Sequence, residues 1–199
     1  MRAVRCFIAI ELEQRLALLL DDVSAALRDA APEWTGEKWV ARHNYHITLK
    51  FLGDLPQSVL PILAADLAAT ASGLNAFEMV AVGIAARPSA LRCDLLWVSF
   101  ADPESRYAAL ADRLESLAAD YGVSPERRGH HPHATLARAR KARAISQDAL
   151  GAGMLVLEPP GPPMSVSRVS LLSSTLTRSG SVYERIAVAP LCTRASEHS

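Results

Sequence analysis

The chain has 199 residues, half of them hydrophobic, which is enough to bury a sizeable core. This length fits one domain or two small lobes better than several independent domains. Lysine plus arginine and aspartate plus glutamate both number 21, so the formal net charge is zero. A protein that held long nucleic acid by charge alone would carry a basic excess, so we expect any nucleic-acid contact to be local and short.

The three cysteines, Cys6, Cys93 and Cys192, lie far apart in the sequence. An odd number without clustering argues against a disulfide framework, and it fits a reducing compartment. The apolar run at the start is brief and is interrupted by Glu11, so it indicates a strand rather than a signal peptide. No stretch approaches the roughly 20 apolar residues that span a bilayer. We therefore predict a cytoplasmic protein that has no membrane segment.

Strand patterns and helix patterns follow one another along the whole chain. In chain order, the sequence predicts a strand at 4–12, a helix at 13–30, a strand at 44–52, a helix from Leu60 to Leu74, strands at 76–86 and 93–101, a helix at 103–121, a strand at 131–139, a short helix at 142–150, and strands at 165–175 and 181–189. Several strands are neighbours in sequence with short connections. This mixture favours an α+β fold with largely antiparallel sheets over a doubly wound parallel sheet.

Turn and cap residues set the boundaries of these elements. Asp102-Pro103 predicts a cap and a first-turn proline for the helix at 103–121. The other boundary signals are Gly53-Asp54 as the end of the strand at 44–52, Arg87–Ser89 as a turn, 151–163 as a Gly- and Pro-rich loop, and Ser179-Gly180 as the turn between the last two strands.

One short pattern occurs twice, as HITL at residues 46–49 and as HATL at residues 133–136. Along a strand, residues two apart share a face, so His46 should share a face with Thr48, and His133 with Thr135. Two such strands side by side would present two imidazoles and two hydroxyls to one cleft. The spacing of a little under half the chain hints at two related lobes.

This set of groups suits the cleavage of a phosphodiester. An unperturbed histidine has a pKa of about 6.5, so one imidazole can be neutral and the other protonated near neutral pH. The neutral one can take a proton from water and the protonated one can give a proton to the leaving oxygen. The threonine hydroxyls can donate hydrogen bonds to the phosphate oxygens. We expect no metal ion and no cofactor.

The motifs resemble those of the two-histidine phosphoesterases, specifically the RNA 2′,3′-cyclic phosphodiesterases formerly called 2′-5′ RNA ligases. Residues 38–53 are similar to the first family motif, and residues 132–138 are similar to the second, including its proline and Arg138. The opening strand, the Leu96–Val98 segment and the stretch from Leu171 to Tyr183 are similar as well. The resemblance therefore covers almost the whole chain.

The resemblance implies an α+β fold for residues 1–199, a single domain of two pseudo-symmetric lobes. Each lobe would be a mostly antiparallel sheet with helices on its outer face, and the active-site cleft would lie between the sheets. It implies a monomer that opens a terminal 2′,3′-cyclic phosphate of RNA to a 2′-phosphate. His133 would activate water, His46 would protonate the 3′ oxygen, and Thr48 and Thr135 would hold the phosphate. An RNA 5′-hydroxyl in place of water would give 2′-5′ ligation.

Several other interpretations remain open at this stage. The substrate could be a small cyclic nucleotide or a 2′-5′ oligonucleotide, or the chain could be a non-catalytic module that binds RNA ends. A zinc site at His130, His131 and His133 is disfavoured because no nearby cysteine or acidic residue completes a ligand set.

Two expectations concern side chains beside the motifs. Arg138 could contact phosphate bidentately, but strict alternation puts it on the face opposite His133. Four aromatic residues could stack on a nucleobase, namely Trp39, Tyr45, Phe51 and Trp97, although we expect Phe51 and Trp97 to pack in the core.

Overall fold

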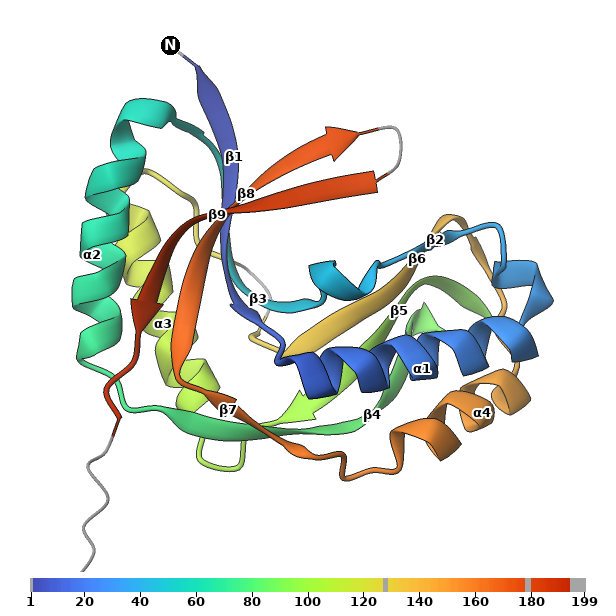
Figure 1. Ribbon diagram of the computed structural model, residues 1–199. Coiled ribbons are helices and arrows are strands. Elements are labelled where there is room, and N and C mark those ends of the chain that lie inside the picture. The colour runs from blue at the N-terminus through green and yellow to red at the C-terminus, as the bar shows by residue number, and fades with distance from the viewer. Residues whose placement is uncertain (1, 127–128, 178–179, 194–199) are drawn as a thin grey trace, which may run out of the picture.

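The computed structural model describes residues 2–126, 129–177 and 180–193, and one curved sheet runs through them (Figure 1). Its strands are β1 (Ala3–Glu11), β2 (Lys38–Trp39), β3 (His46–Pro56), β4 (Phe77–Ser89), β5 (Arg92–Ala101), β6 (His133–Arg143), β7 (Pro163–Val166), β8 (Arg168–Thr177) and β9 (Gly180–Pro190). The order across the sheet is β7-β4-β5-β6-β3-β1-β8-β9, and the short β2 lies beside β6. All neighbouring strands are antiparallel.

The sheet consists of two halves that meet between β3 and β6. We call β3-β1-β8-β9 the β1 half and β6-β5-β4-β7 the β5 half. The halves are joined through a single residue pair, in which Ile47 lies opposite Ala134. The α+β class with antiparallel strands that the sequence predicts is thereby confirmed, and the two pseudo-symmetric lobes that the resemblance implies are halves of one sheet.

Helices cover one face of each half (Figure 1). They are α1 (Gln14–Ala30), α2 (Leu60–Ser72), α3 (Arg106–Asp120) and α4 (Gln147–Leu157). α2 and α3 pack on the β1 half, whereas α1 and α4 pack on the β5 half. Because α1 follows β1 and α3 follows β5, each of these helices leaves one half of the sheet and covers the other, which ties the halves together.

The core lies between the helices and this face of the sheet. The helices α1 and α3 each present an apolar stripe at helical spacing, such as Leu16, Leu20 and Leu27 on α1. These stripes pack in one buried cluster with residues of both motif strands, including Ile47 and Leu136. The burial of these apolar residues is the main driving force for folding, and it leaves the opposite face of the sheet free for polar side chains.

Two strands run further than their turn residues predict. β3 does not end at Gly53-Asp54 but continues to Pro56. Gly53 adopts a positive φ of 74° beside a register shift between Cys6 and Phe7, so the glycine accommodates an irregularity within the strand rather than ending it. Residues 87–89 belong to β4, and the turn falls at residues 90–91.

The predicted start of the third helix is shifted by three residues. α3 begins at Arg106 rather than at Pro103, and Ser105 occupies the N-cap with a φ of 54°. The Asp102 carboxylate still caps this helix, because it accepts a hydrogen bond from the Tyr107 backbone N–H at 2.6 Å.

The predicted helix at 142–150 and loop at 151–163 are also misplaced. β6 extends to Arg143, and α4 begins only after Ser146, whose hydroxyl accepts a hydrogen bond from the Ala149 N–H at 3.0 Å. The predicted turn at Ser179-Gly180 includes Ser179, which lies outside the described residues. No helix in the described ranges is long and apolar enough to cross a membrane.

Candidate active site

The two motif strands carry the same burial pattern at their first seven positions. In β3 and in β6 the order is half-buried, buried, half-buried, buried, buried, exposed, buried. The half-buried positions are those of the motif histidines and threonines. Two consecutive buried residues interrupt the alternation at the same place in both strands, immediately after each threonine.

A β-bulge at Leu49 and another at Leu136 cause this interruption. In the β1–β3 ladder, partners shift from Thr48 to Lys50, so Leu49 has no partner, and in the β5–β6 ladder the shift from Thr135 to Ala137 leaves out Leu136. After a bulge, each following residue lies on the face opposite to the one that strict alternation predicts. The exposed Arg138 therefore returns to the face of His133, which corrects the expectation from strict alternation.

The register between β3 and β6 brings the four motif side chains together. Ile47 lies opposite Ala134 in an antiparallel pair, so His46 is next to Thr135 and His133 is next to Thr48. Ile47 and Ala134 are fully buried on the core side, which places the histidines and threonines together on the other face. Two imidazoles and two hydroxyls thus converge where the halves of the sheet meet.

Each imidazole is held by the same hydrogen bond. His46 Nδ1 lies 2.7 Å from the Asn44 carbonyl oxygen, and His133 Nδ1 lies 2.7 Å from the His131 carbonyl oxygen. A carbonyl oxygen only accepts, so Nδ1 carries the proton and donates in both rings. In the neutral form Nε2 then has a free lone pair, and in the charged form Nε2 carries the acidic proton.

The scan of protein families gives a match over both halves of this arrangement. The model for LigT-like phosphoesterases matches residues 12–97 and 100–183, which include both motifs. The chain belongs to the LigT-like phosphoesterase family.

Relatives and solved structures agree with this assignment. The chain is 31% identical over 167 residues to an RNA 2′,3′-cyclic phosphodiesterase of Aeropyrum pernix, with 81% of this chain and 91% of the relative covered. It is 30% identical over 180 residues to the enzyme of that name from Methanothermobacter thermautotrophicus, with coverage of 90% and 95%. The crystal structure of E. coli LigT in its apo form has the same fold, with a TM-score of 0.71, 23% identity and coverage of 96% and 99%.

His46 in this LigT-like site has aromatic and acidic neighbours. Its ring centroid lies 5.0 Å from that of Phe7 and 5.2 Å from that of Tyr183, which meets it edge-on. Burial lowers the pKa of His46 below its ordinary value, and the nearby His133 lowers it further. The hydrogen bond to the Asn44 carbonyl and the Glu11 carboxylate both act in the opposite direction on this pKa.

His133 has an aromatic neighbour too, but its charged neighbours are basic. The Trp97 ring lies over the imidazole, with 4.1 Å between centroids and 32° between planes. Burial is the main cause that lowers the pKa of His133. The hydrogen bond to the His131 carbonyl raises this pKa, whereas the positive charges of the His131 side chain, Arg138 and Arg87 lower it.

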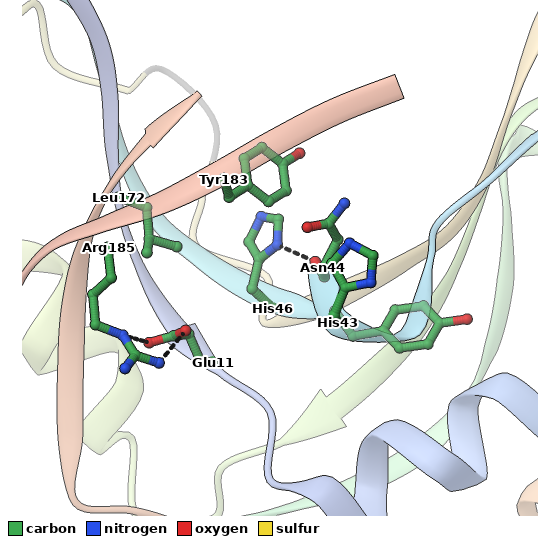
Figure 2. Close-up of a pocket in the computed structure, with 8 residues that line it drawn as sticks. Glu11, His43, Asn44, His46, Leu172, Tyr183 and Arg185 are labelled. Atoms are coloured by element: carbon green, nitrogen blue, oxygen red, sulfur yellow. Dashed lines mark hydrogen bonds and ion pairs between the residues drawn. The ribbon is translucent and has the colours of Figure 1, made fainter. Parts of the chain in front are cut away.

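A cavity of about 170 Å³ opens beside His46 (Figure 2). Tyr183 and Asn44 flank the imidazole, and the Glu11–Arg185 pair lies across the cavity. Arg185 binds the Glu11 carboxylate through two nitrogens, at 2.8 Å and 3.0 Å, and Ser170 donates a further hydrogen bond to it. This network keeps the pKa of Glu11 below its ordinary value despite burial, so the carboxylate stays charged near His46.

The aromatic residues beside the motifs do not lie where the sequence predicts. Phe51 is 61% exposed, because the bulge at Leu49 turns it away from the core. Trp97 lies on the motif face against His133. Trp39 packs against the core at its edge, and its indole N–H donates to the Trp34 carbonyl at 2.9 Å. The predicted core roles of Phe51 and Trp97 are therefore wrong.

The two other histidines of the second motif region differ in their surroundings. His130 Nε2 lies 3.4 Å from an Asp112 carboxylate oxygen, and the His131 side chain is exposed. Among the described residues, no three histidine, cysteine, aspartate or glutamate side chains lie close enough together to hold a metal ion.

Several residues at the site were not predicted from the sequence, namely Phe7, Glu11, Arg87 and Arg185. They lie far from both motifs in sequence, and strand pairing brings them to the site: Glu11 lies opposite His46, and Arg87 lies two strands from Arg138. In the sequence these four residues stand out only as polar or aromatic positions within apolar strands. Such positions are too common to indicate a site.

Proposed function

We propose that this protein hydrolyses RNA 2′,3′-cyclic phosphate ends to 2′-phosphate ends, by acid–base catalysis with His46 and His133 and without a metal ion. The observation that carries the proposal is the pairing of Ile47 with Ala134, which sets both histidines and both threonines around one point. The names of the relatives from Aeropyrum pernix and Methanothermobacter thermautotrophicus support the substrate class.

In the proposed reaction, the oxygen of water attacks phosphorus and the bond from phosphorus to the 3′ oxygen breaks. His133 Nε2 takes a proton from the water, and His46 Nε2 gives its proton to the departing 3′ oxygen. The hydroxyls of Thr48 and Thr135 donate hydrogen bonds to the two non-bridging oxygens, where negative charge accumulates. Arg138 adds positive charge at the same phosphate.

The charged neighbours of the two imidazoles support this division of roles. Glu11 favours the protonated form of His46, which suits the general acid. Arg138 and Arg87 favour the neutral form of His133, which suits the general base.

An RNA 5′-hydroxyl that replaces water would receive the phosphoryl group in the same way and would give a 2′-5′ linkage. We further propose that the protein acts in the cytoplasm, which its unclustered cysteines support. We also propose that it acts as a monomer.

The proposal is tested with an RNA that ends in a 2′,3′-cyclic phosphate, in the presence of EDTA. The parent protein should produce a 2′-phosphate end, and His46→Ala and His133→Ala should each slow this by at least about a hundredfold, the lower range for loss of acid–base catalysis. His130→Gln is the matched control, because a glutamine can still donate a hydrogen bond to Asp112, and among the described residues no hydrogen bond or ion pair joins His130 to a motif side chain.

Two results would contradict the proposal. Turnover by both alanine variants at the parent rate would show that the histidines take no part in catalysis. Loss of the parent activity in EDTA, with recovery on addition of a divalent ion, would show that the reaction needs a metal.

A further inference from the structure

A row of basic side chains crosses the β5 half beside the proposed catalytic groups. Arg87 on β4 pairs with Leu95 on β5, Leu95 pairs with Arg138 on β6, and Arg138 pairs with Lys38 on β2. Directly paired residues of neighbouring strands share a face of the sheet. We call Arg87, Arg138 and Lys38 the cationic row; it lies on the same face as His133.

Among the described residues, the fold offers no carboxylate partner to these charges. Lys38 lies directly opposite Arg138, and like charges at such positions destabilise a sheet. All three side chains are exposed, and within the described part of the chain none lies within ion-pair distance of a carboxylate. By contrast, Arg140 and Arg143, further along β6, are both ion-paired with the buried Glu37.

The corresponding positions in the β1 half are apolar. There Phe51 is the counterpart of Arg138, and it pairs with Phe7, which pairs with Leu172 on β8. Each half therefore carries one motif histidine, one motif threonine and one bulge, but the side chains in the row just beyond the bulge differ between the halves. In the β1 half the row continues to Arg185, the partner of Leu172, but this arginine is ion-paired with Glu11. Of the charges that the structure describes in this row, those without a carboxylate partner thus lie on the β5 side, which indicates a ligand with negative charge there.

The cationic row is connected to the catalytic centre but extends beyond it. Arg87 lies over the Trp97 ring at 4.8 Å, and Trp97 in turn lies against His133. On β5, Ser99 is the partner of His133 and Leu95 is the partner of Arg138. Four residues of strand span about 13 Å, so the backbone of the row lies well away from that of His133, and only its long side chains can reach toward the reacting phosphate.

We infer that Lys38 and Arg87, at the two ends of the cationic row, bind phosphodiester groups of the RNA chain other than the cyclic phosphate that reacts, so that an oligonucleotide is a better substrate than a cyclic mononucleotide. Arg138, between them, faces the reacting phosphate. This inference rests on the proposed function. Arginine binds phosphate oxygens bidentately and lysine binds them as a point charge, and such contacts position a nucleic acid without reading its sequence. A short row also agrees with a chain of zero net charge, since the contact is local.

The test compares three substrates that carry the same terminal 2′,3′-cyclic phosphate. They are a cyclic mononucleotide, an RNA octamer, and an octamer whose internal linkages are neutral methylphosphonates. The parent should show a kcat/KM for the charged octamer at least about tenfold above that for the other two. A change of tenfold corresponds to about 1.4 kcal/mol, which is within the range of a few phosphate contacts.

The variants Lys38→Gln and Arg87→Gln, and the two combined, should reduce this preference for the charged octamer. Lys38→Gln is the cleaner variant, because Lys38 is not among the groups that shift the pKa of His133. Each lost phosphate contact should also reduce the slope of log(kcat/KM) against log salt by about 0.7 for the octamer. Arg113→Gln, an equal charge change at an exposed position of α3, is the control and should keep the parent preference.

An unchanged preference in the double variant would overturn the inference, and so would equal turnover of both octamers by the parent. Turnover of all substrates with no preference would leave the phosphodiesterase proposal intact. If the parent turns over none of them, the proposed function fails. In that case the fluorescence anisotropy of a labelled octamer still measures whether the double variant binds more weakly than the parent, and equal binding would exclude the row as a phosphate site.

Discussion

Ile47 lies opposite Ala134 at the point where the two halves of the sheet meet, and both side chains are completely buried. Neither residue carries a reactive group, yet their pairing fixes the site. His46, Thr48, His133 and Thr135 are each one residue away from this pair along their strands. The relative position of the polar groups is therefore set by backbone hydrogen bonds and core packing, both of which are rigid.

Removal of a threonine hydroxyl should slow the chemical step. Thr48→Val and Thr135→Val keep the side-chain shape but cannot donate to a phosphate oxygen. We expect kcat to fall by about a hundredfold or more in each, the range seen when one donor to a developing negative charge is lost. Thr48→Ser and Thr135→Ser should retain most of the activity. Steady-state kinetics with a cyclic-phosphate RNA measures the difference, and equal rates for the valine and serine variants would contradict it.

The pH dependence of kcat/KM should show an optimum below pH 6.5. Burial lowers the pKa of both His46 and His133 below the ordinary value of about 6.5. The base must be neutral, so activity falls below its pKa, and the acid must be protonated, so activity falls above its pKa. Because kcat/KM reports the free enzyme, the maximum lies between two lowered values. A maximum above pH 7 would show that burial does not control these groups.

Two charge substitutions should show which histidine has the higher pKa. Glu11→Gln removes a charge that raises the pKa of His46, so the alkaline limb of the kcat/KM profile should move to lower pH. Arg138→Gln removes a charge that lowers the pKa of His133, so the acidic limb should move to higher pH. If instead Glu11→Gln moves the acidic limb and Arg138→Gln the alkaline limb, the pKa of His46 is the lower of the two, which contradicts the expected order.

Trp97 should act as a positioning residue for His133. Its ring stacks on the imidazole at 4.1 Å, and aromatic pairs of this kind contribute about 0.5–1.5 kcal/mol beyond their buried area. Trp97→Leu should therefore lower kcat by up to about tenfold, whereas Trp97→Phe should retain most of the activity. NMR titration should show a changed pKa for the His133 imidazole in Trp97→Leu. An unchanged titration curve together with an unchanged kcat would refute this role.

Two glycines of α4 should respond in opposite ways to alanine. A Cβ on Gly153 would come within 2.9 Å of Leu27 Cγ and 2.8 Å of Ile84 Cδ1, where α4 packs on α1 and β4. Gly153→Ala should lower the free energy of unfolding by about 1–3 kcal/mol through overpacking. Gly151 has open space around it, so Gly151→Ala should raise this free energy by about 0.4–1 kcal/mol. Urea unfolding followed by circular dichroism measures both, and a stabilised Gly153→Ala would contradict the tight packing.

Much of the fold could be predicted from local patterns. The helix over 13–30 was recognisable because its apolar residues recur at helical spacing, and α1 begins within a residue of that prediction. The predicted ends of elements were wrong where tertiary contacts override the turn residues. β4 runs through Arg87–Ser89 because these residues pair with β5, and β6 runs to Arg143, whose guanidinium binds the buried Glu37. No local pattern contains such partners.

The sequence by itself determined the chemistry that this protein can carry, because the two His-x-Thr motifs fix which groups are present and which of them share a face of a strand. Only the tertiary structure decided how these groups meet and what surrounds them. The bulges at Leu49 and Leu136 turn Phe51 and Arg138 toward the site, and strand pairing brings Glu11 to His46 and Arg87 to Trp97. The physical reason is that strand register and bulges depend on hydrogen bonds between segments far apart in the chain, which no local pattern specifies.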